Sequence, residues 1–181
     1  SKRWATAYDF PALKEGKVKK ILIPHERPTG MQGFVFNTRK NFFSDPKVRL
    51  AINYAWDFEW TNKTLMYNAY KRTNSYFSNS ELSSSGRLPE GEELKILQKL
   101  KGQVPKQVFN QVYKAPQTDG SGNNRKNLRL ALKLLREAGW AVKDGKLINS
   151  KGIPLKFELL IAYPSIAVSY THLRAHETIA D

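Results

Sequence analysis

The sequence predicts an α/β fold, because short apolar runs rich in β-branched and aromatic residues alternate with amphipathic helical segments. Two such runs, GFVF at residues 33–36 and FELLI at residues 157–161, are expected to be buried strands. The most regular helical pattern lies between them, at residues 125–138. A chain of 181 residues is long enough for one or two domains of this kind.

The N-terminal half begins with a helical stretch at residues 4–16 and a strand at residues 21–23, which ends at a proline. After the strand at residues 33–36, Asp45 precedes Pro46, a pair typical of a capped helix start. Apolar residues then recur at helical spacing and predict one buried face: Val48, Ala51, Ile52 and Ala55. Asp57 is expected to cap a second helix.

The C-terminal half is predicted to carry two surface helices, at residues 90–100 and 105–112, followed by a polar loop. Asn123 or Asn124 should cap the helix at 125–138, which ends before Gly139 with Trp140 packed behind it. The buried face of that helix is predicted to consist of Leu128, Ala131, Leu132, Leu135 and Ala138. Asp144 and Gly145 predict a two-residue hairpin turn between short strands.

The composition excludes several classes of protein. Hydrophobic residues make up 40% of the chain and charged residues 25%, as in ordinary globular proteins, and no apolar run approaches the ~18 residues that span a bilayer. There is no cysteine, so disulfides, thiolate nucleophiles and cysteine metal sites are excluded. An absence of cysteine also fits an exported protein.

The net charge of +14, from 30 Lys and Arg against 16 Asp and Glu, favours an anionic partner. A basic nucleic-acid-binding module is therefore the alternative function. The cations are spread along the chain without a recognition helix, RNP motif or zinc finger, so we expect no nucleic acid partner. A solvated basic surface is the first interpretation, and a preference for an acidic ligand or lipid headgroups is the second.

Catalytic and metal sites are not predicted. We find no nucleophile with a base, no paired carboxylates at a defensible spacing and no cofactor fingerprint, so we expect a non-enzymatic protein without cofactors. The loop at residues 119–124 imitates the start of a calcium loop. It has Asn124 at the sixth position, where glycine is needed, and Leu130 at the twelfth, where glutamate is needed, so no metal is expected.

Two stretches resemble one family. The order Phe36-Asn37, Asp45, Val48-Arg49, Ala51, Ala55 and Asp57 is similar to the motif fN…f.D..vR.Al..A.D of the bacterial extracellular solute-binding proteins of family 5. The stretch LLREAGWAVKDGKLINSKGIPLKFELLI is similar to a second hallmark of that family. The segments PTGMQGFVFN, DFEW and RTNSYF resemble the Yej-type branch, whose members serve oligopeptide and microcin C uptake. Asn41 departs from the proline that is common in the family.

The resemblance implies a fragment of a two-lobed periplasmic binding protein of type II. Residues 1–30 would be the end of the first lobe and a hinge crossing, and residues 31–167 the first part of the second lobe. His25, Glu26 and Arg27 would lie in the hinge, where few torsions absorb domain closure, although an exposed polar loop is the first interpretation of these residues.

The implied function is to bind oligopeptides in the periplasm, as a monomer, and to deliver them to ABC transporter permease subunits. A peptide site needs amide groups and flat aromatic walls, which indicates Arg72, Asn74, Tyr76 and Phe77 as ligand-binding residues. A solvated surface connection explains the same residues without a ligand. Ser1 follows no signal peptide, so we expect the signal peptide and most of the first lobe to be encoded upstream.

The last residues, 168–181, are predicted to be an artefact. Val168 to Thr178 reads VSYTHLRAHET, which matches the conceptual translation of a widely used transposase sequencing adapter. His172 and His176 stand at i and i+4 beside Glu177, a spacing that would otherwise suggest a helical metal site. We assign these residues no function, and sequencing of the source DNA would decide between the two interpretations.

Overall fold

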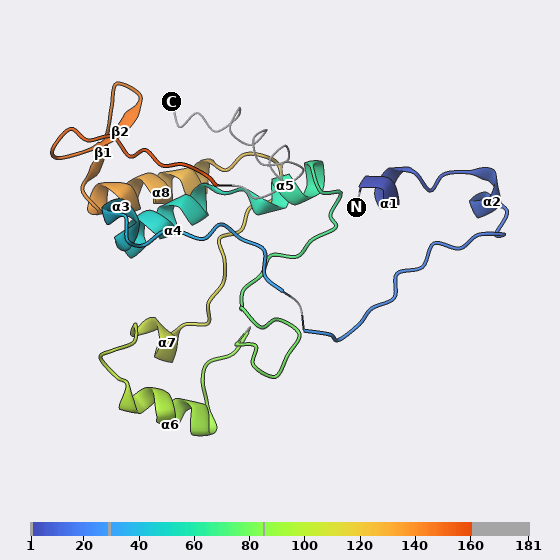
Figure 1. Cartoon of the computed structure of the whole chain (residues 1–181), viewed down its shortest axis with the longest axis horizontal. Helices are drawn as coiled ribbons and strands as arrows, with labels where there is room; N and C mark the ends of the chain where they lie inside the picture. The colour runs from blue at the N-terminus through green and yellow to red at the C-terminus, as the bar shows by residue number, and fades with distance from the viewer. Residues whose placement is uncertain (1, 29, 85, 161–181) are drawn as a thin grey trace. The chain divides into compact units, whose positions relative to one another are not determined.

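Helices α4 (Pro46–Ala55) and α8 (Arg125–Glu137) pack side by side and hold most of the buried core (Figure 1). The computed structural model describes residues 2–28, 30–84 and 86–160. These residues divide into two units. One unit contains the described residues of Ser1–Phe34 and Met66–Ala115, and the other contains those of Val35–Leu65 and Pro116–Asp181, with both packed helices.

The contact between α4 and α8 uses valine, alanine and leucine side chains. Val48 and Ala51 on α4 are 0% and 1% exposed, and they belong to the same cluster as Ala131 and Leu135 on α8. Short side chains let two helix axes approach closely, and burial of their methyl groups stabilises the pair. The predicted faces are therefore confirmed in part, because the other predicted residues of both faces are only half-buried. Asn127 of α8, which was not predicted to face inward, is buried as well.

The start of α4 also follows the prediction. The Asp45 side chain accepts a hydrogen bond from the Lys47 backbone N–H at 2.7 Å, and Pro46 occupies the first helical position. A short helix, α3 (Asn41–Ser44), precedes it. Arg49 fixes the junction, because its guanidinium donates to the carbonyl oxygens of Phe43, at 2.6 Å, and Ser44, at 2.9 Å.

The end of α8 leads directly into a hairpin. Gly139 adopts φ +82°, a conformation that suits glycine, and Trp140 behind it is 8% exposed within the core cluster. Strands β1 (Trp140–Lys143) and β2 (Lys146–Asn149) are antiparallel, with Trp140 opposite Asn149. Asp144 and Gly145 both have positive φ, as a two-residue hairpin turn requires, so the predicted turn is confirmed.

Three predicted strands are wrong within the described residues: 21–23, 33–36 and 157–160 are not strands. The physical reason is that a strand exists only when its backbone finds a hydrogen-bonded neighbour, and composition does not supply one. Ile21, Leu22 and Ile23 are 62%, 82% and 79% exposed. Residue 161 lies outside the described residues.

Phe36 and Phe157, which belong to the mispredicted runs at 33–36 and 157–160, still contact the core. The ring of Phe43 lies 5.0 Å from that of Phe36 and 5.2 Å from that of Phe157, measured between centroids. Each run therefore places one ring against the core, but neither run is buried as predicted, because Val35 and Leu160 are 96% and 98% exposed.

The other unit has short helices and little buried surface. It contains α1 (Lys2–Thr6), α2 (Pro11–Lys14), α6 (Gly91–Lys99) and α7 (Gln107–Asn110). The helix predicted at residues 4–16 is thus two shorter helices, while α6 and α7 confirm the two predicted surface helices at reduced length. Among its described residues, the buried ones are Ser75 and Ala115. In the described part of the chain, no helix is both long and apolar enough to cross a membrane.

The packing of α4 on α8 predicts that truncating Val48 destabilises the protein. Val48→Ala should lower the free energy of unfolding by about 2 kcal/mol, because it removes two fully buried methyl groups and leaves a cavity. Urea titration followed by circular dichroism measures this. Val35→Ala is the matched control, since Val35 is 96% exposed and the same change there should cost under ~0.5 kcal/mol. Equal effects at the two positions would contradict the described core.

Candidate functional site

The segment from Arg72 to Phe77 is fixed at its centre by two residues. The Asn74 side-chain oxygen accepts a hydrogen bond from the Ala115 backbone N–H at 2.8 Å, across 41 positions of sequence. The hydroxyl of the buried Ser75 accepts one from the Ser84 backbone N–H at 3.2 Å. Hydrogen bonds to Ala115 and to Ser84 therefore anchor the segment, although it contains no helix or strand.

The predicted ligand-binding residues separate into two kinds. Tyr76 and Phe77 are 73% and 56% exposed, so their rings are available to a ligand. Arg72 is half-buried, and the side-chain oxygen of Asn74 is already engaged by Ala115. The geometry thus gives Asn74 a positioning role that residue type alone did not predict. A role for these four residues in ligand binding stays a prediction.

The predicted hinge residues lie in an extended, exposed stretch. Residues 19–28 contain no helix or strand, and the side chains of His25, Glu26 and Arg27 are all exposed. The imidazole Nδ1 of His25 accepts a hydrogen bond from the Arg27 backbone N–H at 3.2 Å, which forms a local turn. A hinge function for this turn stays a prediction.

A polar contact that the sequence did not predict lies where α5 (Phe58–Thr64) begins. Asp57 caps α5 as expected, accepting from the Trp60 backbone N–H at 3.0 Å. The same carboxylate oxygen also accepts from the hydroxyl of Thr118 at 2.5 Å. The carboxylate of Glu59 accepts from the Thr118 backbone N–H at 3.0 Å. Thr118 thus joins the loop before α8 to the start of α5, with Asp57 buried.

The loop from Thr118 to Asn124 is shaped by its own side chains. Asp119 accepts hydrogen bonds from the Ser121 hydroxyl and backbone N–H, at 2.6 and 2.9 Å, and these bonds lower the pKa of the exposed Asp119 carboxyl. Gly122 has φ +85° and lies under the indole of Trp60, where a Cβ would approach the ring to 3.0 Å. In the described part of the chain, no group of three potential metal-ligating side chains comes together.

Of the two predicted caps of α8, the Asn123 side-chain oxygen accepts a long hydrogen bond from the Arg125 backbone N–H at 3.5 Å, and the prediction for Asn124 needs correction. Asn124 does precede α8, but its side chain forms no cap bond to that helix. Instead, its amide donates to the carbonyl oxygens of Tyr54 and Ala55, at 3.1 and 3.2 Å, at the end of α4. These carbonyls lack intrahelical partners, so they are ready acceptors for the Asn124 Nδ2 group. In this orientation the Asn124 side-chain oxygen, which would have to accept a cap bond, has no hydrogen-bond partner among the described residues. Asn127 similarly donates to the Gln117 carbonyl at 3.1 Å.

The contact of Thr118 with the two carboxylates predicts a loss of stability on Thr118→Val. The valine keeps the shape but removes the hydroxyl, so the buried Asp57 carboxylate loses a donor, at a cost of about 1–3 kcal/mol in the free energy of unfolding. Thr64→Val is the control, because the exposed Thr64 hydroxyl donates only to the Trp60 carbonyl within its own helix. If the two variants unfold at the same urea concentration, the hydrogen bond to Asp57 does not stabilise the unit.

Comparison with known proteins places this chain among binding proteins. The family model for bacterial extracellular solute-binding proteins, family 5 middle, matches residues 3–169. The protein is 49% identical over 164 residues to "Probable peptide-binding protein YejA" of Agrobacterium fabrum. This alignment covers 89% of this chain and 26% of that protein.

Two other relatives match with similar coverage. "Peptidoglycan-binding protein YepA" of the same organism is 41% identical over 170 residues, covering 92% of this chain and 28% of that protein. "Uncharacterized protein YejA" of Escherichia coli is 42% identical over 162 residues, covering 89% and 27%. The chain spans about a quarter of the length of these curated relatives. Since the family model matches nearly the whole chain, this protein belongs to the bacterial extracellular solute-binding proteins of family 5.

Proposed function

We propose that this chain is part of the substrate-binding component of an ABC importer, which binds oligopeptides in the periplasm and delivers them to the permease. The observation that carries the proposal is the family 5 match over residues 3–169, together with 49% identity to a relative whose printed name is peptide-binding. The proposed protein is monomeric outside its encounter with the permease. The alternative of a nucleic-acid-binding module gains no support from these relatives.

The proposed architecture is two-lobed, with the ligand held between lobes that close on it. Residues 31–167 would belong to the second lobe, and the turn at His25, Glu26 and Arg27 would act as a hinge. The exposed, extended backbone of that turn supports the proposal, because few packing contacts would resist a change in its torsions.

The proposed ligand contacts are the rings of Tyr76 and Phe77. Flat aromatic side chains hold peptides of varied sequence, because they bury area without demanding one partner chemistry. Their exposure supports this role, and the bond between Asn74 and Ala115 would reduce the conformational entropy that the segment loses when a peptide binds. Arg72 is suited to bind the carboxylate of a peptide, because the arginine guanidinium can form bidentate hydrogen bonds with a carboxylate.

A chimera tests the proposed function. Residues 3–167 of this chain replace the matching quarter of the Agrobacterium relative, and both proteins are titrated calorimetrically with a mixture of oligopeptides. We expect the chimera to bind the mixture with a dissociation constant within about tenfold of the parent's, since the segment would supply equivalent contacts. A chimera with the circular dichroism and melting behaviour of its parent that binds no peptide, while the parent does, would refute the proposal.

Two variants of the same chimera test the site. Tyr76→Ala and Phe77→Ala should each weaken peptide binding by roughly tenfold, the effect of losing an aromatic contact of about 1–2 kcal/mol. Leu82→Ala, at a residue that is 68% exposed in the same unit, is the control and should leave the affinity unchanged. If all three variants bind the peptides as well as the chimera does, or if only Leu82→Ala loses binding, then Tyr76 and Phe77 do not contact the ligand.

A further inference from the structure

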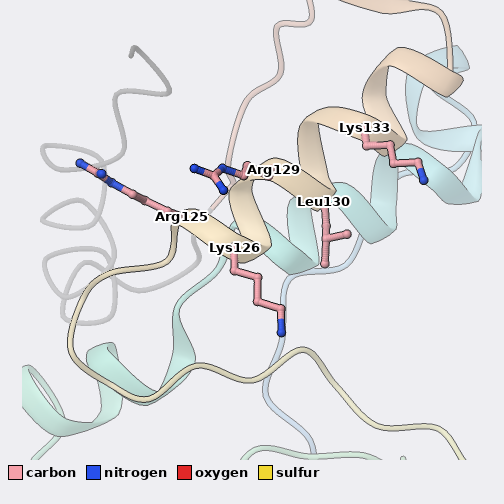
Figure 2. A pocket seen from close by; sticks show the side chains of 5 residues that line it. All are labelled: Arg125, Lys126, Arg129, Leu130 and Lys133. Atoms are coloured by element: carbon pink, nitrogen blue, oxygen red, sulfur yellow. The ribbon is translucent and has the colours of Figure 1, made fainter.

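Four cationic side chains lie along one side of helix α8, as Figure 2 shows. They line a shallow hollow together with one apolar side chain: Arg125, Lys126, Arg129, Leu130 and Lys133. We refer to these five residues as the basic row. All are exposed, including Leu130 at 39%. Sequence analysis treated the cations as scattered, and the fold of α8 brings four of them together.

The basic row is opposite the face by which α8 is packed. The buried residues of α8 are Asn127, Ala131 and Leu135. At about 100° per residue, Arg129 lies about 160° from Ala131 around the helix axis. The apolar face of α8 is therefore occupied by α4, and the basic row points into solvent.

The acidic residues in the described part of the chain do not neutralise the cations of the basic row. Among the described residues, no ion pair involves Arg125, Lys126, Arg129 or Lys133. The carboxylate on α8, Glu137, is paired with Lys47 at 3.1 Å. Arginine and lysine are almost never buried without a partner. The basic row therefore remains in contact with solvent unless an anionic partner covers it. Exposed apolar side chains elsewhere in the chain do not carry this requirement for a charged partner.

We propose that the basic row docks this protein on the surface of a bilayer that contains anionic phospholipids. The cations from Arg125 to Lys133 extend about 12 Å along the helix axis and spread over about 100° around it, so they form a patch that can face a flat array of phosphate groups. Each Lys or Arg near such a surface contributes about 1 kcal/mol, and the aliphatic stems with Leu130 suit the boundary between headgroups and acyl chains. The chain's net charge of +14 acts in the same direction.

The observations favour a bilayer over a nucleic acid. The basic row contains no aromatic side chain on which a base could stack, and no asparagine or glutamine that could read a base edge. The apolar face of α8 is already packed, so the helix would rest on the headgroups without inserting. Such docking is peripheral, and salt should weaken it.

Vesicle co-sedimentation tests the proposal with the chain as it stands. We expect binding to vesicles of phosphatidylcholine mixed with phosphatidylglycerol, weakened by salt, and none to phosphatidylcholine alone. The variant Arg125→Gln/Arg129→Gln/Lys133→Gln should reduce the partition coefficient by roughly 100-fold. Lys99→Gln/Lys101→Gln/Lys106→Gln removes the same charge from exposed residues of the other unit, and it should reduce binding by less than about fivefold.

A third variant separates charge from folding. Arg125→Lys/Arg129→Lys keeps every charge and should retain binding, and circular dichroism compares the helical content of all variants with the parent. Equal losses in the two glutamine variants would overturn the proposal, because net charge alone would then explain the attraction. Binding that is equal on both kinds of vesicle, or binding to a DNA duplex and not to vesicles, would also overturn it.

Discussion

The contact between α4 and α8 is the interaction on which the larger unit depends. Val48 and Ala51 meet Ala131 and Leu135 with almost no exposed surface, and the remaining elements attach to the edges of this contact. Arg49 holds α3 to the start of α4, while Trp140 carries the hairpin against the end of α8. Since these four side chains are almost fully buried and closely packed, substitutions that change their volume should be poorly tolerated. The described residues of the other unit form no comparable helix contact, and hydrogen bonds such as that between Asn74 and Ala115 hold its segments.

The parts of this fold that the sequence could predict are those decided by neighbouring residues. Asp45 before Pro46, Gly139 after α8 and Asp144 before Gly145 each act within a few positions, so their chemistry is visible in the sequence. The apolar runs at 33–36 and 157–160 were predicted as strands because their composition fits one. Whether such a run pairs depends on a partner distant in sequence, and composition does not contain that information.

The same distinction applies to the candidate site. Aromatic residues in a polar loop pointed to Tyr76 and Phe77, whose exposure agrees with a surface role. The anchoring function of Asn74 depends on Ala115, 41 positions away, and that of Thr118 depends on Asp57, 61 positions away. No local pattern marks bonds of this kind. The basic row could have been predicted from the sequence, because its cations recur at helical spacing along one face of α8. Sequence analysis considered only the net charge and the spread of cations over the whole chain, and so missed it.

The side chain of Asn124 has a consequence for how the two helices are aligned lengthwise. Small apolar faces resemble themselves after each turn, so a seam of Val, Ala and Leu could in principle close again after sliding by one turn, about 5.4 Å. The amide of Asn124 reaches both Tyr54 and Ala55 within 3.2 Å, and a slide of that size would break both bonds and strand a buried polar group. The bonds of Asn124, together with the ion pair between Lys47 of α4 and Glu137 of α8, therefore favour one register among those that hydrophobic packing would tolerate, much as a polar residue specifies alignment in a coiled coil.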